Sequence, residues 1–228
     1  MSREQKIISL DPIDRKKSKE LGIIGRLLIS RYSGGKPIKK MDDFGHYMFT
    51  GVQGSGKSTS CIWYAEKLIK KYKKKGYNIR LLSNIGIGEL VSRQDLYKRI
   101  DEFNPNDKEI RIVIIDEIQT YFPKETRNKD TKALIDDLIA IFSQLRKRTT
   151  YILSTSQIYG RVDKSLREQC LYMINCKLNF NKTKLVNEFI PADDILCDEL
   201  GRWAGKPKRI YVHGLQKLKY DTKKIIRC

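Results

Sequence analysis

The 228-residue sequence lacks the cysteine and histidine patterns of zinc sites and of disulfide frameworks. It has two histidines and an odd number of cysteines, which are widely separated and include no C-x-x-C pair: Cys61, Cys170, Cys176, Cys197 and Cys228. Disulfide-stapled secreted domains and zinc modules are therefore excluded. The thiols are expected to be reduced, as in a cytosol-like compartment.

Long apolar runs are also missing. A membrane-spanning helix needs about 20 consecutive apolar residues. The nearest candidate, LGIIGRLLI at 21–29, is shorter and contains Gly22, Gly25 and Arg26. It also lacks the small-residue cleavage site of a secretory signal. Basic residues on both sides leave two interpretations open, an ordinary packed arm or a segment along a partner subunit or membrane surface. We expect no signal peptide and no transmembrane helix.

Acidic residues are few compared with basic ones. The chain has 46 lysines and arginines against 27 aspartates and glutamates, which gives a formal charge of +19. Such an excess suits a partner coated in phosphates, nucleic acid above all. The alternative is an AT-rich genome that favours lysine, whose side chains would then simply be solvated. No base-reading motif is present, so the favoured partner is double-stranded DNA bound without sequence preference.

Strand-like and helix-like segments alternate along most of the chain. Short apolar runs predict strands over 46–50, 78–84, 110–117, 149–157 and 170–178. Apolar residues at helical spacing predict helices over 57–75, 92–103, 130–147 and 162–169. This alternation is typical of an α/β fold with a doubly wound, mainly parallel sheet. Period-2 segments at 184–189 and 209–214 predict peripheral C-terminal strands.

The stretch GVQGSGKST at 51–59 fits the pattern G-x-x-x-x-G-K-[ST] and lies between a predicted strand and a predicted helix. In that context it indicates a phosphate-binding loop rather than a flexible turn, because glycines let the backbone approach phosphates and a helix N-terminus attracts anions. Lys57 would reach the outer phosphates and Ser58 would ligate Mg²⁺. The residues predicted to bind ATP are Gly51, Gln53, Gly54, Ser55, Gly56, Lys57, Ser58 and Thr59.

A second motif, VIIDE, ends the strand predicted at 110–117. Asp116 would hold Mg²⁺ directly or through water, beside the phosphate loop. Glu117 would polarise a water molecule for attack on the γ-phosphate, a role that nucleotide kinases do not need. Gln157, at the tip of the strand 149–157, is a candidate sensor of the γ-phosphate. Taken alone, Gln157 is more typical of a surface amide at a strand end, and the phosphate loop together with the Asp116–Glu117 strand favours the sensor role.

The order GVQGSGKST, IIDEIQTYF, LRKRTTYILSTSQ and LREQ resembles the FtsK–HerA branch of the additional-strand P-loop ATPases. Within that branch the chain is most similar to the genome-packaging ATPases of tailless icosahedral viruses with an internal membrane. The resemblance implies a RecA-like core and a homo-oligomeric ring, usually a hexamer, that pulls double-stranded DNA through its centre. It also implies a place in the host cytoplasm or the virion, with capsid vertex or viral membrane proteins as docking partners.

The expected organisation follows from the motifs and the charge. It comprises a basic N-terminal arm over 1–40, a P-loop ATPase core over 41–180 and a C-terminal extension over 181–228 that completes or flanks the sheet.

The resemblance further implies an arginine that reaches a neighbouring subunit's nucleotide. Spacing does not separate the candidates Arg146, Arg148, Arg161 and Arg167. Arg167 is favoured because it lies on the segment that runs from the sensor strand toward an expected subunit boundary. Contact with DNA phosphates or a surface ion pair is the alternative role for each.

Three other functions compete with a DNA-packaging motor. IDEIQTYF and LRKR also resemble Zot-like ATPases, which help to extrude filamentous phage but typically carry a membrane helix. A small-molecule kinase would leave Glu117 and the charge unexplained. A scaffold without activity is disfavoured by the intact Lys57, Asp116 and Glu117.

Overall fold

The fold is built on one large sheet. The computed structural model describes residues 43–102, 108–122, 129–178 and 184–192, together with the backbone of 196–197, 203–204 and 209–214. The arm predicted over 1–40 lies outside the described residues, as does most of the extension predicted over 181–228.

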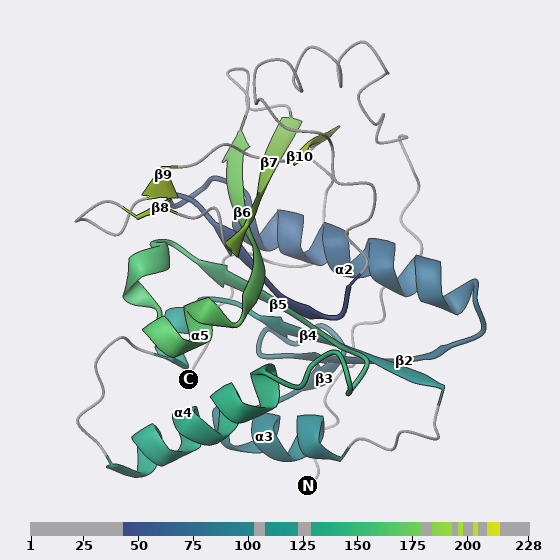
Figure 1. Cartoon of the computed structure of the whole chain (residues 1–228). Helices are drawn as coiled ribbons and strands as arrows, with labels where there is room; N and C mark the ends of the chain where they lie inside the picture. Colours follow the sequence, from purple (N-terminus) through teal and green to yellow (C-terminus); the bar gives the residue numbers. More distant parts are fainter. Residues whose placement is uncertain are drawn as a thin grey trace, which may run out of the picture.

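Eight strands form this sheet in the order β10-β7-β6-β1-β5-β4-β2-β3 (Figure 1). They are β1 (Gly45–Thr50), β2 (Asn78–Ser83), β3 (Glu89–Leu90), β4 (Glu109–Ile115), β5 (Thr150–Ser156), β6 (Cys170–Leu178), β7 (Lys184–Pro191) and β10 (Arg209–Gly214). The strands from β6 to β3 run parallel, whereas β7 and β10 extend the β6 edge in antiparallel fashion. Two further strands, β8 (Leu196–Cys197) and β9 (Trp203–Ala204), pair separately.

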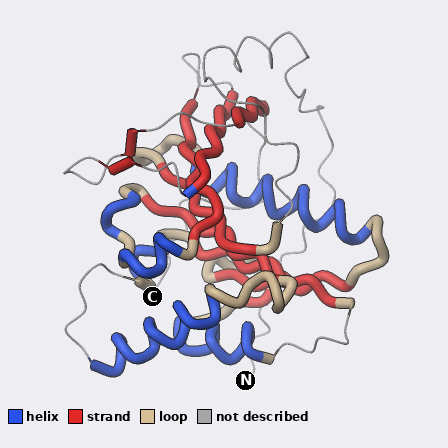
Figure 2. The backbone as a smooth tube through the Cα atoms, viewed as in Figure 1, coloured by secondary structure: helices blue, strands red, loops and turns tan. Residues whose placement is uncertain are grey.

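Helices cover both faces of the sheet (Figure 2). Helix α2 lies on one face and α3 and α4 lie on the other (Figure 1). The helices are α2 (Lys57–Lys73), α3 (Arg93–Asp101), α4 (Lys129–Phe142) and α5 (Lys164–Glu168), with 3-10 turns η1 (Ile118–Thr120) and η2 (Tyr159–Arg161). This arrangement confirms the predicted α/β class with a doubly wound, mainly parallel sheet.

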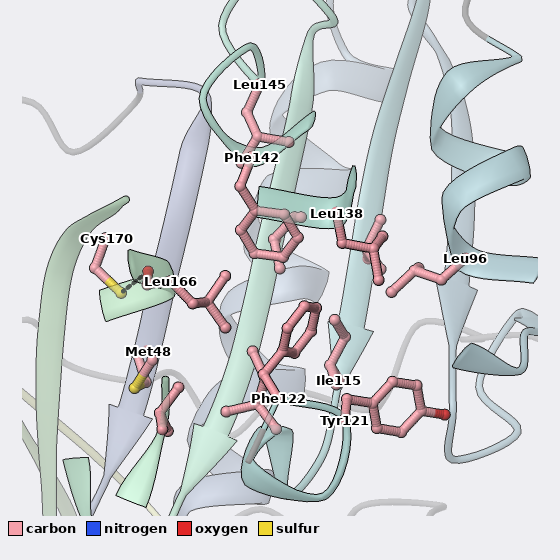
Figure 3. Packing of buried hydrophobic residues seen from close by; sticks show 14 of the residues in the cluster. Met48, Leu96, Ile115, Tyr121, Phe122, Leu138, Phe142, Leu145, Leu166 and Cys170 are labelled. Carbon is pink, nitrogen blue, oxygen red and sulfur yellow. Dashed lines mark hydrogen bonds between the residues drawn. The ribbon is translucent and has the colours of Figure 1, made fainter. Parts of the chain in front are cut away.

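Two hydrophobic cores result, one on each face. Strand β4 contributes to both, because Val113 and Ile115 pack toward α3 and α4 while Ile112 and Ile114 pack toward α2. The nearly continuous apolar run of this strand is therefore explained by burial on both faces. Figure 3 shows the first core, where Leu138 and Phe142 of α4 lie over the strands and Leu138 lies beside Leu96 of α3.

Helix boundaries differ from the predictions mainly in α4. The helix predicted over 130–147 ends at Phe142. The Ser143 hydroxyl donates to the Ala140 carbonyl at 2.6 Å, and such local bonds compete with helix continuation. Thr149 then adopts a left-handed conformation, with φ 44°, which turns the chain into β5. Helix α3 begins as predicted, since the Ser92 side chain accepts from the Asp95 N–H.

The strand order places three strand ends together. Strand β5 lies between β1 and β4, with Thr50 opposite Ser156 and Ile115 opposite Ser154. The carboxyl ends of β1, β4 and β5 therefore meet at one edge, where parallel sheets usually bind ligands. No helix within the described ranges is long and apolar enough to cross a membrane.

A buried histidine makes the fold sensitive to acid. His46 of β1 is fully buried between the Ser154 hydroxyl, 2.7 Å from Nε2, and the Cys170 thiol, 3.1 Å from Nδ1. Desolvation lowers the pKa of His46 to about 3, below its unfolded value near 6.5. The unfolded chain therefore binds a proton that the folded chain excludes between these two pH values.

We expect the free energy of unfolding to fall by about 1.4 kcal/mol between pH 8 and pH 5.5 because of His46 alone. Above about pH 7.5 this contribution is constant, because the unfolded histidine is then neutral as well. Urea denaturation across this range measures it, and His46→Gln serves as the comparison because the amide does not titrate. Equal pH dependence in the two proteins would contradict the assignment.

Candidate functional site

The loop between β1 and α2 packs tightly against strands β6 and β7. Gly54 and Gly56 adopt left-handed conformations, with φ 76° and 84°. A Cβ atom at Gly56 would collide with the Leu185 side chain of β7, and one at Gly51 would lie 2.6 Å from the Cys176 carbonyl of β6. Glycine is thus required here both by backbone conformation and by close packing.

The same loop has the features of an anion-binding site. Gly56 is the N-cap of α2 and has no side chain to cap it, so the first N–H groups of the helix face an incoming anion. The Lys57 ammonium is mostly buried and donates to the Val52 carbonyl at 3.2 Å. The buried Ser55 hydroxyl has no hydrogen-bond partner in the described part of the chain. Lys57 and Ser55 are therefore available to phosphate oxygens.

Asp116 is the centre of a hydrogen-bond cluster at the carboxyl edge of the sheet. Its Oδ1 accepts from the Ser58 hydroxyl at 2.8 Å and from the Thr155 hydroxyl at 2.7 Å. The Asn84 side chain donates to the Asp116 carbonyl at 2.9 Å and accepts from its N–H at 2.8 Å. Three elements besides β4 thus hold Asp116: α2, β5 and the end of β2.

The donor set beside Asp116 fits Mg²⁺. A serine hydroxyl and a carboxylate are hard oxygen ligands, and Mg²⁺ is typically bound by one or two carboxylates together with substrate phosphates and water. No group of three or more His, Cys, Asp or Glu side chains suited to a metal ion occurs within the described ranges. The site therefore resembles a place for a phosphate-bound Mg²⁺ and not an all-protein metal cage.

Glu117 lies beside Asp116 and meets two glutamines. Its backbone is left-handed, with φ 52°, and its N–H donates to the Thr155 hydroxyl at 2.9 Å. The Gln157 amide donates to Oε1 at 3.5 Å, and the Gln119 amide donates to Oε2. The structure thus brings the predicted water-activating residue and the predicted sensor together, both of them accessible to solvent.

Three residues of this cluster were not predicted from the sequence: Asn84, Gln119 and Thr155. Asn84 and Thr155 lie at the carboxyl ends of predicted strands, and that position is itself a usable signal because parallel strands bring their polar ends to one edge. Gln119 gives no such signal. It reaches Glu117 only because the chain turns sharply into η1 after β4.

Two of the candidate arginines lie far from the phosphate loop of their own chain. Arg146 and Arg148 precede β5, whose seven residues span about 20 Å before the carboxyl edge. Arg148 forms an ion pair with Asp101 at 2.9 Å. This segment enters β5 at the edge opposite the phosphate loop of its own chain, and a role of Arg146 or Arg148 toward a neighbouring subunit's nucleotide stays a prediction.

The other two arginines follow β5. The Arg167 guanidinium donates to the Val162 carbonyl at 3.1 Å and lies 5.3 Å from the Tyr159 ring centre, so it is engaged locally. Arg161 lies in η2, four positions after Gln157, and its side chain is exposed. Of the four arginines, Arg161 follows the strand end at the site most closely.

Residues 47–178 match the model of the ATPase family associated with various cellular activities (AAA). The matched segment begins in β1 and ends with β6, so it contains the phosphate loop, Asp116, Glu117 and Gln157. A search of curated proteins finds no significant match.

Among solved structures, the fold resembles the N-terminal domain of zonular occludens toxin from Neisseria meningitidis, with a TM-score of 0.53. The two are 17% identical, and the match covers 77% of this chain and 96% of that domain. A chain of the HORMA:CdnC:Trip13 complex of E. coli MS115-1 matches with TM-score 0.44 and 11% identity, over 58% of this chain and 48% of that one. The motif-based assignment is thus supported as a P-loop ATPase, and the FtsK–HerA packaging branch is not specifically supported.

Thr155→Val is expected to weaken Mg²⁺-dependent nucleotide binding about tenfold, as is typical when a residue that orients a metal ligand is lost. The valine keeps the volume but removes the hydroxyl that orders both Asp116 and the Glu117 N–H. Titration of a fluorescent ATP analogue with and without Mg²⁺ measures the effect.

Thr150→Val is the matched control, because Thr150 is equally buried in β5 but lies at its other end and donates to the Arg148 carbonyl. Both variants should lose about 1–2 kcal/mol of stability. Equal Mg²⁺-dependent affinity in the two would show that Thr155 does not order the site.

Proposed function

This chain belongs to the ATPase family associated with various cellular activities (AAA), and we propose that it hydrolyses ATP and couples hydrolysis to mechanical work. The observation that carries the proposal is the convergence of Ser58, Asp116, Glu117 and Gln157 at one sheet edge. A site that only bound a nucleotide would not need Glu117 next to the metal-binding carboxylate.

Each residue has a separate task in the proposed reaction. The loop backbone and Lys57 bind the phosphates, and Lys57 exchanges its bond with the Val52 carbonyl for a phosphate oxygen. Ser58 and Asp116 would hold Mg²⁺, which supplies charge neutralisation on the phosphates when bound. Glu117 orients the attacking water and accepts its proton. Gln157 contacts Glu117 already and is placed to report the γ-phosphate to it.

Ring assembly and an arginine supplied in trans belong to the same proposal. Arg161 is the better candidate for that arginine, because the guanidinium of Arg167 is engaged with Val162 and Tyr159 and that of Arg148 with Asp101. A neighbouring subunit that docks against η2 would meet Arg161 close to Gln157.

Two versions of the proposal differ in what the ATPase moves. We favour a Zot-like ATPase for phage assembly or export, since the similarity in fold to a zonular occludens toxin domain covers most of both chains. A packaging motor for double-stranded DNA is the second candidate, and the charge of +19 supports it. ATP turnover that rises strongly with long duplex DNA favours packaging, and indifference to duplex DNA favours the Zot-like version.

Glu117→Gln should bind ATP but reduce its hydrolysis at least a hundredfold, because the amide cannot accept a proton from water. Lys57→Ala should lose nucleotide affinity itself. Steady-state phosphate release and equilibrium ATP binding, measured on the same preparations, separate the two effects.

Lys132→Ala is the control for Lys57→Ala, because it removes one positive charge at an exposed position of α4. The proposal fails if Glu117→Gln retains full turnover. It also fails if the wild-type protein transfers phosphate to a small acceptor in place of water.

Gln119→Met is expected to raise basal ATP turnover roughly fivefold. The substitution removes one hydrogen bond to the Glu117 carboxylate, which contributes about 1 kcal/mol, and a barrier lower by that amount gives this change in rate. The Gln119 amide occupies a Glu117 carboxylate oxygen that would otherwise contact the attacking water, and methionine keeps the side-chain length. Turnover and ATP affinity are measured together, and only turnover should change. Gln94→Met, at an exposed position of α3, is the control. A fall in turnover would instead make Gln119 a residue that positions Glu117 for catalysis.

A further inference from the structure

The C-terminal end of α2 and the turn that follows carry an unusual density of lysines. We call this set the lysine surface; its members are Lys67, Lys70, Lys71, Lys73, Lys74 and Lys75. Lys67, Lys73, Lys74 and Lys75 are exposed, and the other two are partly exposed. These side chains therefore present positive charge to solvent at one end of one helix.

Some basic residues elsewhere in the described chain are paired with acids. Arg80 and Arg99 share Glu89 and Glu102 in a surface network, and Lys177 lies 2.8 Å from Glu188. On the lysine surface, Lys70 lies 3.8 Å from Glu66. Lys73, Lys74 and Lys75 form no ion pair with any acidic residue that the structure describes. The lysine surface is thus distinguished by three consecutive lysines that share no acidic partner among the described residues.

Lysines three and four positions apart are neighbours on a helix, where like charges destabilise it. The negative end of the helix dipole offsets part of this repulsion. Aromatic rings hold some of these ammonium groups in place, since Lys67 lies 5.3 Å from the Trp63 ring centre and Lys71 lies 4.8 Å from that of Tyr72. The arrangement is thus repulsive but ordered, which suits a surface that binds a polyanion.

The lysine surface lies away from the nucleotide site. Helix α2 begins at the phosphate loop and is 17 residues long, so its far end is about 25 Å from the loop. Binding at the lysine surface can therefore be altered without touching the residues that bind ATP.

We propose that the lysine surface binds the phosphate backbone of double-stranded DNA without sequence preference. Lysine contacts phosphates as a point charge and does not read base edges in a fixed geometry. A membrane surface is a poorer fit, because Tyr77 is the one exposed large apolar or aromatic side chain of the described residues that adjoins these lysines. The inference rests on the second candidate function, the packaging motor, and identifies where its double-stranded DNA would be held.

The test compares two triple variants of the full chain that lose the same charge. Lys73, Lys74 and Lys75 are changed to glutamine in one, and the exposed Lys98, Lys132 and Lys147 in the other. Anisotropy of a labelled 30-base-pair duplex is measured between 50 and 200 mM salt. We expect the first variant to bind at least tenfold more weakly. The slope of the logarithm of the binding constant against the logarithm of the salt concentration should become shallower by roughly two to three. The control should stay within about twofold of wild type.

Equal weakening in both variants would overturn the proposal, because net charge alone would then explain binding. So would unchanged DNA affinity with lost binding to phosphatidylserine vesicles, which would make the lysine surface a membrane contact. Basal ATP turnover should be the same in all three proteins. Failure of the proposed ATPase function would appear as absent turnover in wild type and would leave the DNA comparison interpretable.

Discussion

The site depends on the contact between the Ser58 hydroxyl and the Asp116 carboxylate, because this contact joins the phosphate loop to the strand that carries the acids. Strand β5 lies between β1 and β4, and its Thr155 hydroxyl donates to the same carboxylate oxygen of Asp116. Asn84 fixes the Asp116 peptide from the other side. The carboxylate is therefore oriented before any nucleotide arrives, and binding need not reorganise it.

The antiparallel edge of the sheet also supports the site. Leu185 of β7 packs against Gly56, and Asn187 of the same strand accepts from the Ser60 hydroxyl at 2.9 Å within the first turn of α2. Strands that seem peripheral in sequence thus bound the phosphate loop directly. Strand β7 therefore contacts both the phosphate loop and the first turn of α2.

The arginines differ in position in ways that their spacing in the sequence does not reveal. Arg146 and Arg148 stand close in sequence to the sensor strand, yet they enter it at the edge opposite the nucleotide. Arg167 lies on the segment that leaves the strand, yet its guanidinium is engaged by Val162 and Tyr159. Arg161 is exposed and follows the strand end at the site, and its contact with a neighbouring subunit stays a proposal.

From the sequence alone, the alternating strands and helices, the phosphate loop and the Asp116–Glu117 pair could be predicted, because each is encoded by local periodicity or by adjacent residues. Tertiary structure alone decided which polar side chains meet Asp116 and Glu117, since Asn84, Gln119 and Thr155 come from separate segments. It also decided where α4 ends and which arginines lie near the site. These features depend on strand order and long-range packing, which no short window of sequence contains.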